Sequence, residues 1–125
     1  MRALFIASCV LGTATVVQAG DIHLQVRWDG DGQFRHELQV PHRSAVKSCE
    51  KLPAGGKLMW HFDASAPVNF NVHFHEGKAL QIPVRRDQRT SDDGVFEAKA
   101  ERAYCWMWRN KSGGPVKLSM QLSRQ

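Results

Sequence analysis

The chain has 125 residues, of which 42% are hydrophobic and 23% charged, and its formal net charge is +5. This composition supports one packed globular domain and excludes global disorder. The length excludes a βα-barrel enzyme and a two-domain dinucleotide enzyme, because each needs about 200 residues or more.

The first 19 residues predict a secretory signal peptide. Arg2 supplies a positive charge, an uncharged and largely apolar stretch follows, and the small residue Ala19 ends it. The stretch is shorter than the roughly 20 apolar residues of a membrane span. A lipoprotein cleavage box ending at Cys9 is the alternative, although only eight residues precede that cysteine. We therefore expect cleavage after Ala19 and a periplasmic or secreted protein.

Removal of this leader leaves residues 20–125, with 16 Lys and Arg against 12 Asp and Glu, a net charge of +4. No basic run exceeds two adjacent residues, as at Arg85 and Arg86. We expect this charge to be scattered over a solvated surface, with a weak attraction to anionic lipid or glycan. The sequence predicts no nucleic-acid partner and no transmembrane segment in the mature chain.

Alternating apolar residues predict strands from the start of the mature chain. The first two cover residues 22–28 and 34–40, and the Asp-Gly-Asp-Gly run between them is typical of a hairpin turn. This run also resembles part of a calcium loop, but the later ligands and the closing Glu are absent.

The remaining strands are predicted at 58–62, 68–75, 104–109 and 116–122, with glycines between them. The polar run 85–94 shows no alternation and is expected to be a loop, either solvated or in contact with a partner. No segment has a sustained helical period. About eight short strands predict an all-β fold, an antiparallel β-sandwich of jelly-roll type, as a single domain over 20–125.

Strand parity separates a core face from an outer face, because successive side chains point to opposite sides of a sheet. The expected aromatic centre consists of Trp60, Phe62, Phe70, Phe74, Tyr104, Trp106 and Trp108. The expected outward set consists of Met59, His61, Asn69, Asn71, His73, His75, Cys105, Met107 and Arg109.

Two cysteines, Cys49 and Cys105, remain after the leader is removed. An even pair in an oxidising compartment predicts one disulfide. Closing a loop of this size stabilises a fold by about 3–4 kcal/mol. Free thiols, including a thiolate that binds a metal ion, are the alternative.

Two segments resemble a known family, the GOLD domain of secretory-pathway cargo receptors and lipid-transfer proteins. The first is the glycine turn and Leu-x-Trp-x-Phe run at 55–62, followed by the Val-Asn-Phe run at 68–70. The second runs from Tyr104 to Asn110 and continues to Ser112 and the last strand; it is similar to the family's Tyr-x-x-x-Phe-x-Asn motif. The resemblance covers residues 34–122.

This resemblance implies a β-sandwich that binds proteins or membranes, with Asn110 in a structural role and no catalytic residue to carry over. Trp108 stands where the family usually has Phe, and Met107 stands where the cargo receptors have a cysteine. A bridge between Cys49 and Cys105 is therefore not implied by the family.

The outward set also contains residue types that bind metal ions. His73 and His75 share a strand face about 6.5–7 Å apart, which permits two nitrogens at about 2 Å from one ion. Imidazole suits copper or zinc, and thioether and thiolate suit Cu(I). The candidate ligands for copper, as Cu(I) or Cu(II), or for zinc are His73, His75, His61, Met107 and Met59. A merely polar strand face, with methionines that fill gaps, is the structural alternative.

A small hydrolase is the remaining alternative. Ser112, Ser119, Asp63 and the histidines supply suitable residue types. However, the chain has no nucleophile-elbow pattern, no locatable carboxylate pair and no phosphate-binding glycine loop. We therefore expect a non-enzymatic exported binding module whose partner is an envelope or exported protein.

Overall fold

The computed structural model describes residues 11–12 and 20–125, so the predicted signal peptide lies almost entirely outside the described residues. The all-β class is confirmed. The strands are β1 (Asp21–His23), β2 (Gln33–Val40), β3 (Ala45–Leu52), β4 (Lys57–Glu76), β5 (Ala79–Glu97), β6 (Arg102–Arg109) and β7 (Val116–Arg124). Within the described ranges there are thus seven strands instead of about eight. No helix of the described part of the chain is long and apolar enough to cross a membrane.

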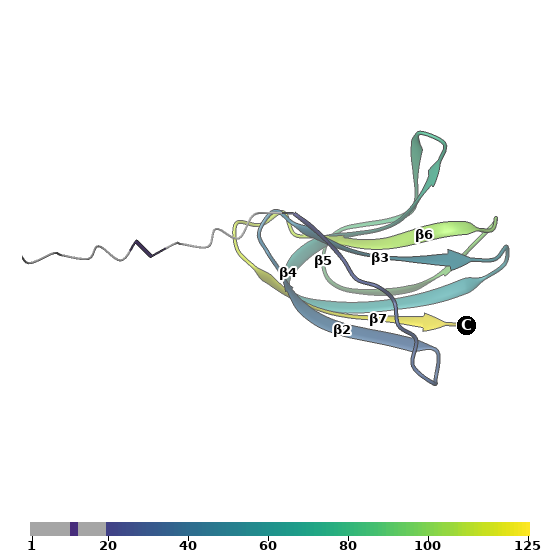
Figure 1. Cartoon of the computed structure of the whole chain (residues 1–125), viewed down its shortest axis with the longest axis horizontal. Coiled ribbons are helices and arrows are strands. Elements are labelled where there is room, and N and C mark those ends of the chain that lie inside the picture. Colours follow the sequence, from purple (N-terminus) through teal and green to yellow (C-terminus); the bar gives the residue numbers. More distant parts are fainter. Residues whose placement is uncertain (1–10, 13–19) are drawn as a thin grey trace, which may run out of the picture.

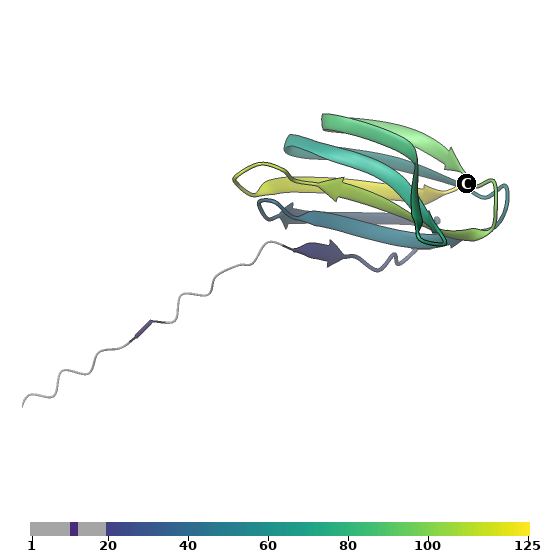
Figure 2. The same ribbon diagram turned by 90° about the horizontal axis from the view of Figure 1, so that it is seen from above.

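The strands form one sheet in the order β1-β3-β6-β4-β7-β2, and β5 pairs with β4. The long strand β4 joins the two wings of the sheet. Its first half pairs with β7 over 58–64, and its second half pairs with β6 over 69–73. The β3–β6 wing and the β2–β7 wing curl around one hydrophobic core, as the two ribbon views show (Figure 1, Figure 2).

One strand pair departs from the antiparallel expectation. β1 runs parallel to β3, with Ile22 opposite Val46, so the sheet is mixed. The predicted strand over 22–28 forms ladder pairs only at its start, and the amide of Leu24 adds one bond to the carbonyl of Lys47 at 2.9 Å. Its apolar side chains still pack against the core, since the alternation of apolar residues continues to Trp28.

The two strands predicted at 58–62 and 68–75 are one continuous strand, β4. Its pairing with β5 shifts register between Asp63 and Val68 and again between Val72 and Phe74. Such irregularities bend a strand and increase its twist. The bend explains how one strand serves both wings, and the interruption of the apolar pattern at 63–67 explains why the sequence predicted two strands.

The predicted loop at 85–94 was wrong, because these residues belong to β5. β5 pairs only with β4 and is therefore an edge strand whose side chains are mostly exposed. An edge strand is held by backbone hydrogen bonds to its neighbour and needs no buried face of its own. Polar composition was therefore a misleading signal at this position.

The aromatic centre lies between the wings. Phe70 contacts three of the other aromatic rings. Its ring centroid lies 5.2 Å from that of Trp60, 5.3 Å from that of Phe62 and 5.3 Å from that of Trp108. Tyr104 and Trp106 are also buried, and each contacts Phe96. Phe74 is only half-buried, because it lies near the end of β4, where the sheet leaves the core.

The turn between the first two predicted strands is closed by an aspartate. The carboxylate of Asp29 accepts hydrogen bonds from the amides of Asp31, at 2.8 Å, and Gln33, at 2.9 Å. These bonds, that of Gln33 foremost, hold the pKa of Asp29 below its ordinary value. The carboxylate thus caps backbone amides, as an Asx turn does.

Candidate functional site

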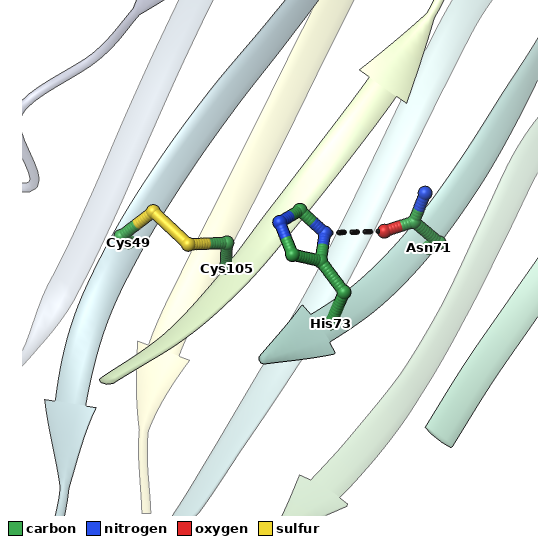
Figure 3. The surroundings of a disulfide bond; sticks show 4 residues. All are labelled: Cys49, Asn71, His73 and Cys105. Carbon is green, nitrogen blue, oxygen red and sulfur yellow. Dashed lines mark hydrogen bonds between the residues drawn. A yellow bond between two sulfur atoms is a disulfide. The ribbon is translucent and has the colours of Figure 1, made fainter. Parts of the chain in front are cut away.

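The outer face of β3, β6 and β4 carries the residues that the sequence selected as site candidates. Cys49 on β3 lies opposite Cys105 on β6, and Cys105 lies opposite His73 on β4. The two cysteines form a disulfide with their Cα atoms 4.0 Å apart. Figure 3 shows the His73 ring beside this bond, on the next strand of the sheet. Both sulfur atoms are therefore in the disulfide, and the alternative that one of these cysteines binds a metal ion as a thiolate is wrong for this structure.

His73 points to the outer face, as its parity predicts, yet it is only 4% exposed. Its Nδ1 lies 2.7 Å from the side-chain oxygen of Asn71, and an amide oxygen can only accept, so Nδ1 donates. The pKa of His73 is lowered from 6.5, first by burial and then by the positive charges of Lys47 and His75. His73 is thus held as a neutral imidazole whose Nε2 carries the free lone pair.

His75 and Met107 lie near His73. The His75 ring is exposed and stands perpendicular to that of His73, with centroids 5.9 Å apart. Met107 is half-buried and lies opposite Asn71, which places it diagonally from His73 on the same face.

The other two metal candidates lie elsewhere. His61 precedes His73 by 12 residues on the same strand, a separation of about 40 Å along an extended chain. Its Nε2 contacts Asp63 Oδ2 at 3.0 Å. Met59 lies opposite Ser123 and Val95, in the other half of β4.

The candidate ligands therefore fall into two groups: His73 and His75 with Met107 of β6 beside them, and His61 and Met59 in the other half of β4. No cluster of three or more His, Cys, Asp or Glu that could hold a metal ion occurs among the described residues. The copper or zinc assignment stays a prediction, now confined to His73 and His75, with Met107 as the nearest thioether.

The two serines of the hydrolase alternative lie apart, Ser112 in the β6–β7 loop and Ser119 on β7. The hydroxyl of Ser112 donates to Asn110 Oδ1 at 2.6 Å. Ser119 lies opposite Asp63 and Glu37 on its neighbouring strands. In the part of the chain that the structure describes, no hydrogen bond joins a serine hydroxyl to an imidazole.

Two adjacent hollows on the surface bring together cationic side chains from distant parts of the sequence. We call the surface formed by Arg43, Arg85, Arg109 and Lys111 the basic groove. One hollow, of about 190 Å³, has Asn69, Phe70, Asn71, Ile82, Arg85, Asp87, Met107, Arg109 and Lys111 as its lining. The other, of about 360 Å³, is formed by Arg43, Arg109, Asn110 and Lys111. The two hollows share Arg109 and Lys111 in their linings.

The basic groove was missed by the sequence analysis, which expected scattered charge. Arg43 lies in the β2–β3 loop, Lys111 in the β6–β7 loop and Arg85 on the edge strand β5. Parity correctly placed Arg109 on the outer face. However, nothing in the sequence indicated that two loops separated by more than 60 residues meet at one end of the sheet.

A third hollow, of about 290 Å³, is mainly apolar and lies at the base of the β4–β5 hairpin, whose end projects from the body in Figure 1. Phe74, Phe96 and Tyr104 line it, and Ile82 beside them is 42% exposed. Lys99 and Arg102 also border it, and the Arg102 guanidinium lies 4.6 Å over the Phe74 ring. This hollow differs from the basic groove in having aromatic rings as its main lining.

Comparison with known proteins shows that the chain resembles solved structures in its fold. No protein-family model matches the chain, and no curated protein sequence matches it. Among solved structures, PliG of Aeromonas hydrophila, a periplasmic inhibitor of g-type lysozyme, superposes with a TM-score of 0.68 at 17% sequence identity. A mutant of PliG from Escherichia coli, also a periplasmic inhibitor of g-type lysozyme, superposes with a TM-score of 0.55 at 11% identity. Each alignment covers 86% of this chain and 100% of the other. The likeness shows a common fold.

Proposed function

We propose that this chain is an exported, non-catalytic binding protein that inhibits a lysozyme of the g type. The observation that carries the proposal is the fold likeness to PliG, which extends over the full length of that inhibitor. At 17% identity the likeness carries no residue roles, so the partner is the part of the proposal that needs an experiment.

The chemistry of the surface supports a binding role. The hollows present arginines, lysines, amides and aromatic rings, which are the groups that form contacts between proteins. Arg is enriched at such interfaces because its planar guanidinium forms paired hydrogen bonds with carboxylates. The resemblance to GOLD domains implies the same class of function, and it stays a proposal.

We further propose a periplasmic location. The disulfide between Cys49 and Cys105 belongs to an oxidising compartment, and both PliG structures are described as periplasmic proteins. Cell fractionation of the producing host tests this, with free-thiol labelling before and after denaturation. A cytoplasmic protein with two free thiols would contradict the location.

The test of function is an inhibition assay on the full protein, produced by export so that the disulfide forms. Hydrolysis of purified peptidoglycan by a g-type lysozyme is measured against inhibitor concentration, with lysozymes of other types in parallel. We expect a saturating, stoichiometric loss of g-type activity and a 1:1 complex by light scattering. The same preparation, reduced and unfolded, is the control. Full lysozyme activity at a large molar excess of the folded protein would overturn the proposal.

A further inference from the structure

We propose that His73 and His75, with Met107 beside them, form a binding site for one Cu(I) ion on the outer face of the sheet. This property is separate from the proposed inhibition of a lysozyme and does not depend on it. Three kinds of observation carry it: the bonding of the His73 ring, the place of this ring in the sheet, and the ligands and charges around it.

The His73 ring has one nitrogen engaged and the other free. Nδ1 donates to the side-chain oxygen of Asn71 at 2.7 Å, and Figure 3 shows the second nitrogen on the side of the ring away from Asn71. Among the described residues, the buried side-chain nitrogens and oxygens without a hydrogen-bond partner are Ser48 Oγ, Trp106 Nε1 and Trp108 Nε1. Nε2 of His73 is not one of these atoms, although no hydrogen bond joins it to another described residue. Nε2 therefore reaches the surface, while the side chain as a whole is only 4% exposed.

This is the bonding that a histidine ligand has in metalloproteins. Such a histidine almost always donates its other ring N–H to an oxygen of the protein, which fixes the tautomer and the orientation of the ring. Burial, and then the positive charges of Lys47 and His75, lower the pKa of His73, so the ring is neutral at pH 7. A neutral imidazole has no proton to lose before it binds an ion. The lone pair of Nε2 is thus available and held in one direction.

The pairing of β4 with β5 is irregular at the same position. Between two ladder pairs, β4 has one residue, His73, where β5 has two, Ile82 and Pro83. Such bulges are over-represented next to functional sites, where they re-aim a side chain. The position of His73 is therefore one at which the regular sheet has been modified.

Two further ligands lie near His73. The exposed His75 ring has its centroid 5.9 Å from that of His73, with an angle of 86° between the ring planes. An ion about 2 Å from a ring nitrogen is about 3 Å from the ring centroid, so two rings on one ion have centroids up to about 6 Å apart. The observed separation corresponds to a wide nitrogen–metal–nitrogen angle. Met107, diagonal to His73 on β6, offers a thioether within the reach of a long side chain.

The ligands and the surrounding charge favour Cu(I) over Zn²⁺. No cluster of three or more His, Cys, Asp or Glu occurs in the described part of the chain, so a tetrahedral zinc site has too few ligands. Imidazole and thioether are neutral, and thioether is a soft ligand that suits Cu(I). Lys47 and Arg85 stand at the two ends of the row that crosses β3, β6, β4 and β5 through Met107. Their charge repels a divalent ion more strongly than a monovalent one, because Coulomb energy is proportional to ionic charge.

The test compares the exported, disulfide-bonded protein with two matched double variants. His75→Gln/Met107→Leu removes one imidazole and the thioether of the proposed site, and it keeps the buried His73. His61→Gln/Met59→Leu removes the same two groups from the other half of β4 and is the control. Cu(I) is titrated without oxygen against a coloured Cu(I) chelator, Zn²⁺ is titrated in parallel, and thermal midpoints confirm that each variant folds.

We expect the parent to bind one Cu(I) per chain and to bind Zn²⁺ more weakly. The site variant should bind Cu(I) at least about tenfold more weakly than the parent, and the control should stay within about twofold. X-ray absorption of the parent complex should show nitrogen at about 2.0 Å and sulfur at about 2.3 Å from the ion.

Four results would each overturn the proposal: no competition for Cu(I) by the parent, equal binding by the two variants, tighter binding of Zn²⁺ than of Cu(I), or a Cu(I) complex without sulfur. None of them changes the outcome expected in the peptidoglycan hydrolysis assay, so the metal site and the proposed inhibition fail separately.

Discussion

Asn110 ties the end of β6 to the end of β2, because its side-chain nitrogen donates to the Val40 carbonyl at 3.0 Å across 70 residues of sequence. The same nitrogen donates to the carbonyls of Gly114, at 2.8 Å, and Pro41, at 3.2 Å. Its oxygen accepts from the amide of Ser112 at 2.9 Å. Asn110 is fully buried, and its bond to Val40 is buried with it. One side chain thus fixes the loops on which Arg43 and Lys111 are carried.

Replacement of this amide should therefore destabilise the fold. We expect Asn110→Ala to lower the free energy of unfolding by about 2–4 kcal/mol, because buried backbone groups lose their partners. Denaturant unfolding measures the change. Ser119→Ala, at an exposed position on β7, is the control and should change stability by less than about 0.5 kcal/mol. A loss below about 1 kcal/mol in Asn110→Ala would show that water replaces these bonds.

Gly94 packs directly against the Trp60 indole. A Cβ atom at this position would lie 2.3 Å from Cζ2 of Trp60, which is nearly fully buried and has little room to move. We expect Gly94→Ala to destabilise the protein by about 1–3 kcal/mol through overpacking. Gly113→Ala is the matched control, since nothing lies within 4 Å of the added atom. Equal stability of the two variants would show that the Trp60 ring shifts freely.

The disulfide crosses two adjacent strands and joins residues 56 positions apart. Chain-entropy arguments assign about 4 kcal/mol to a loop of this length. We expect Cys49→Ala/Cys105→Ala to lower the free energy of unfolding by roughly this amount while the far-ultraviolet spectrum of a folded β protein is retained. The effect of a reducing agent on the parent is the independent measurement. A double variant as stable as the parent would contradict the prediction.

The buried His73 makes stability depend on pH. Its pKa is lowered from 6.5 by burial, and further by Lys47 and His75, so the folded protein binds this proton less readily than the unfolded chain. The stability that neutral His73 contributes is therefore complete above pH 6.5 and is lost as the pH falls below that value. We expect stability to decline from about pH 7 to pH 5, and His73→Gln to flatten the decline. His23→Gln, at an exposed position on β1, should leave the decline as in the parent.

The alternation of apolar residues predicted the two faces of the strands well. Trp60 and Phe62 point into the core and His61 points away from it, because the side-chain period of a strand is a local property of the backbone. The even pair of cysteines behind a predicted export leader likewise predicted the disulfide. These expectations succeeded because each depends only on neighbours in sequence or on the compartment.

The arrangement of strands in space was not available from such local patterns. β5 is a strand although it is polar, because β4 offers it a row of backbone donors and acceptors. His61 and His73 share an outward face but lie in different halves of β4, so an inference from parity alone placed them together wrongly. Which outward residues meet depends on strand order and on bends in the chain.

The same distinction applies to the basic groove. Composition and parity established that residues 20–125 are basic, that Arg109 faces outward and that the aromatic residues form the core. The meeting of Arg43 and Lys111 depends on the order β3-β6-β4, which brings the β2–β3 and β6–β7 loops to one end of the sheet. Long-range pairing of strands sets this proximity, and pairing depends on contacts among distant segments that a local sequence pattern does not record.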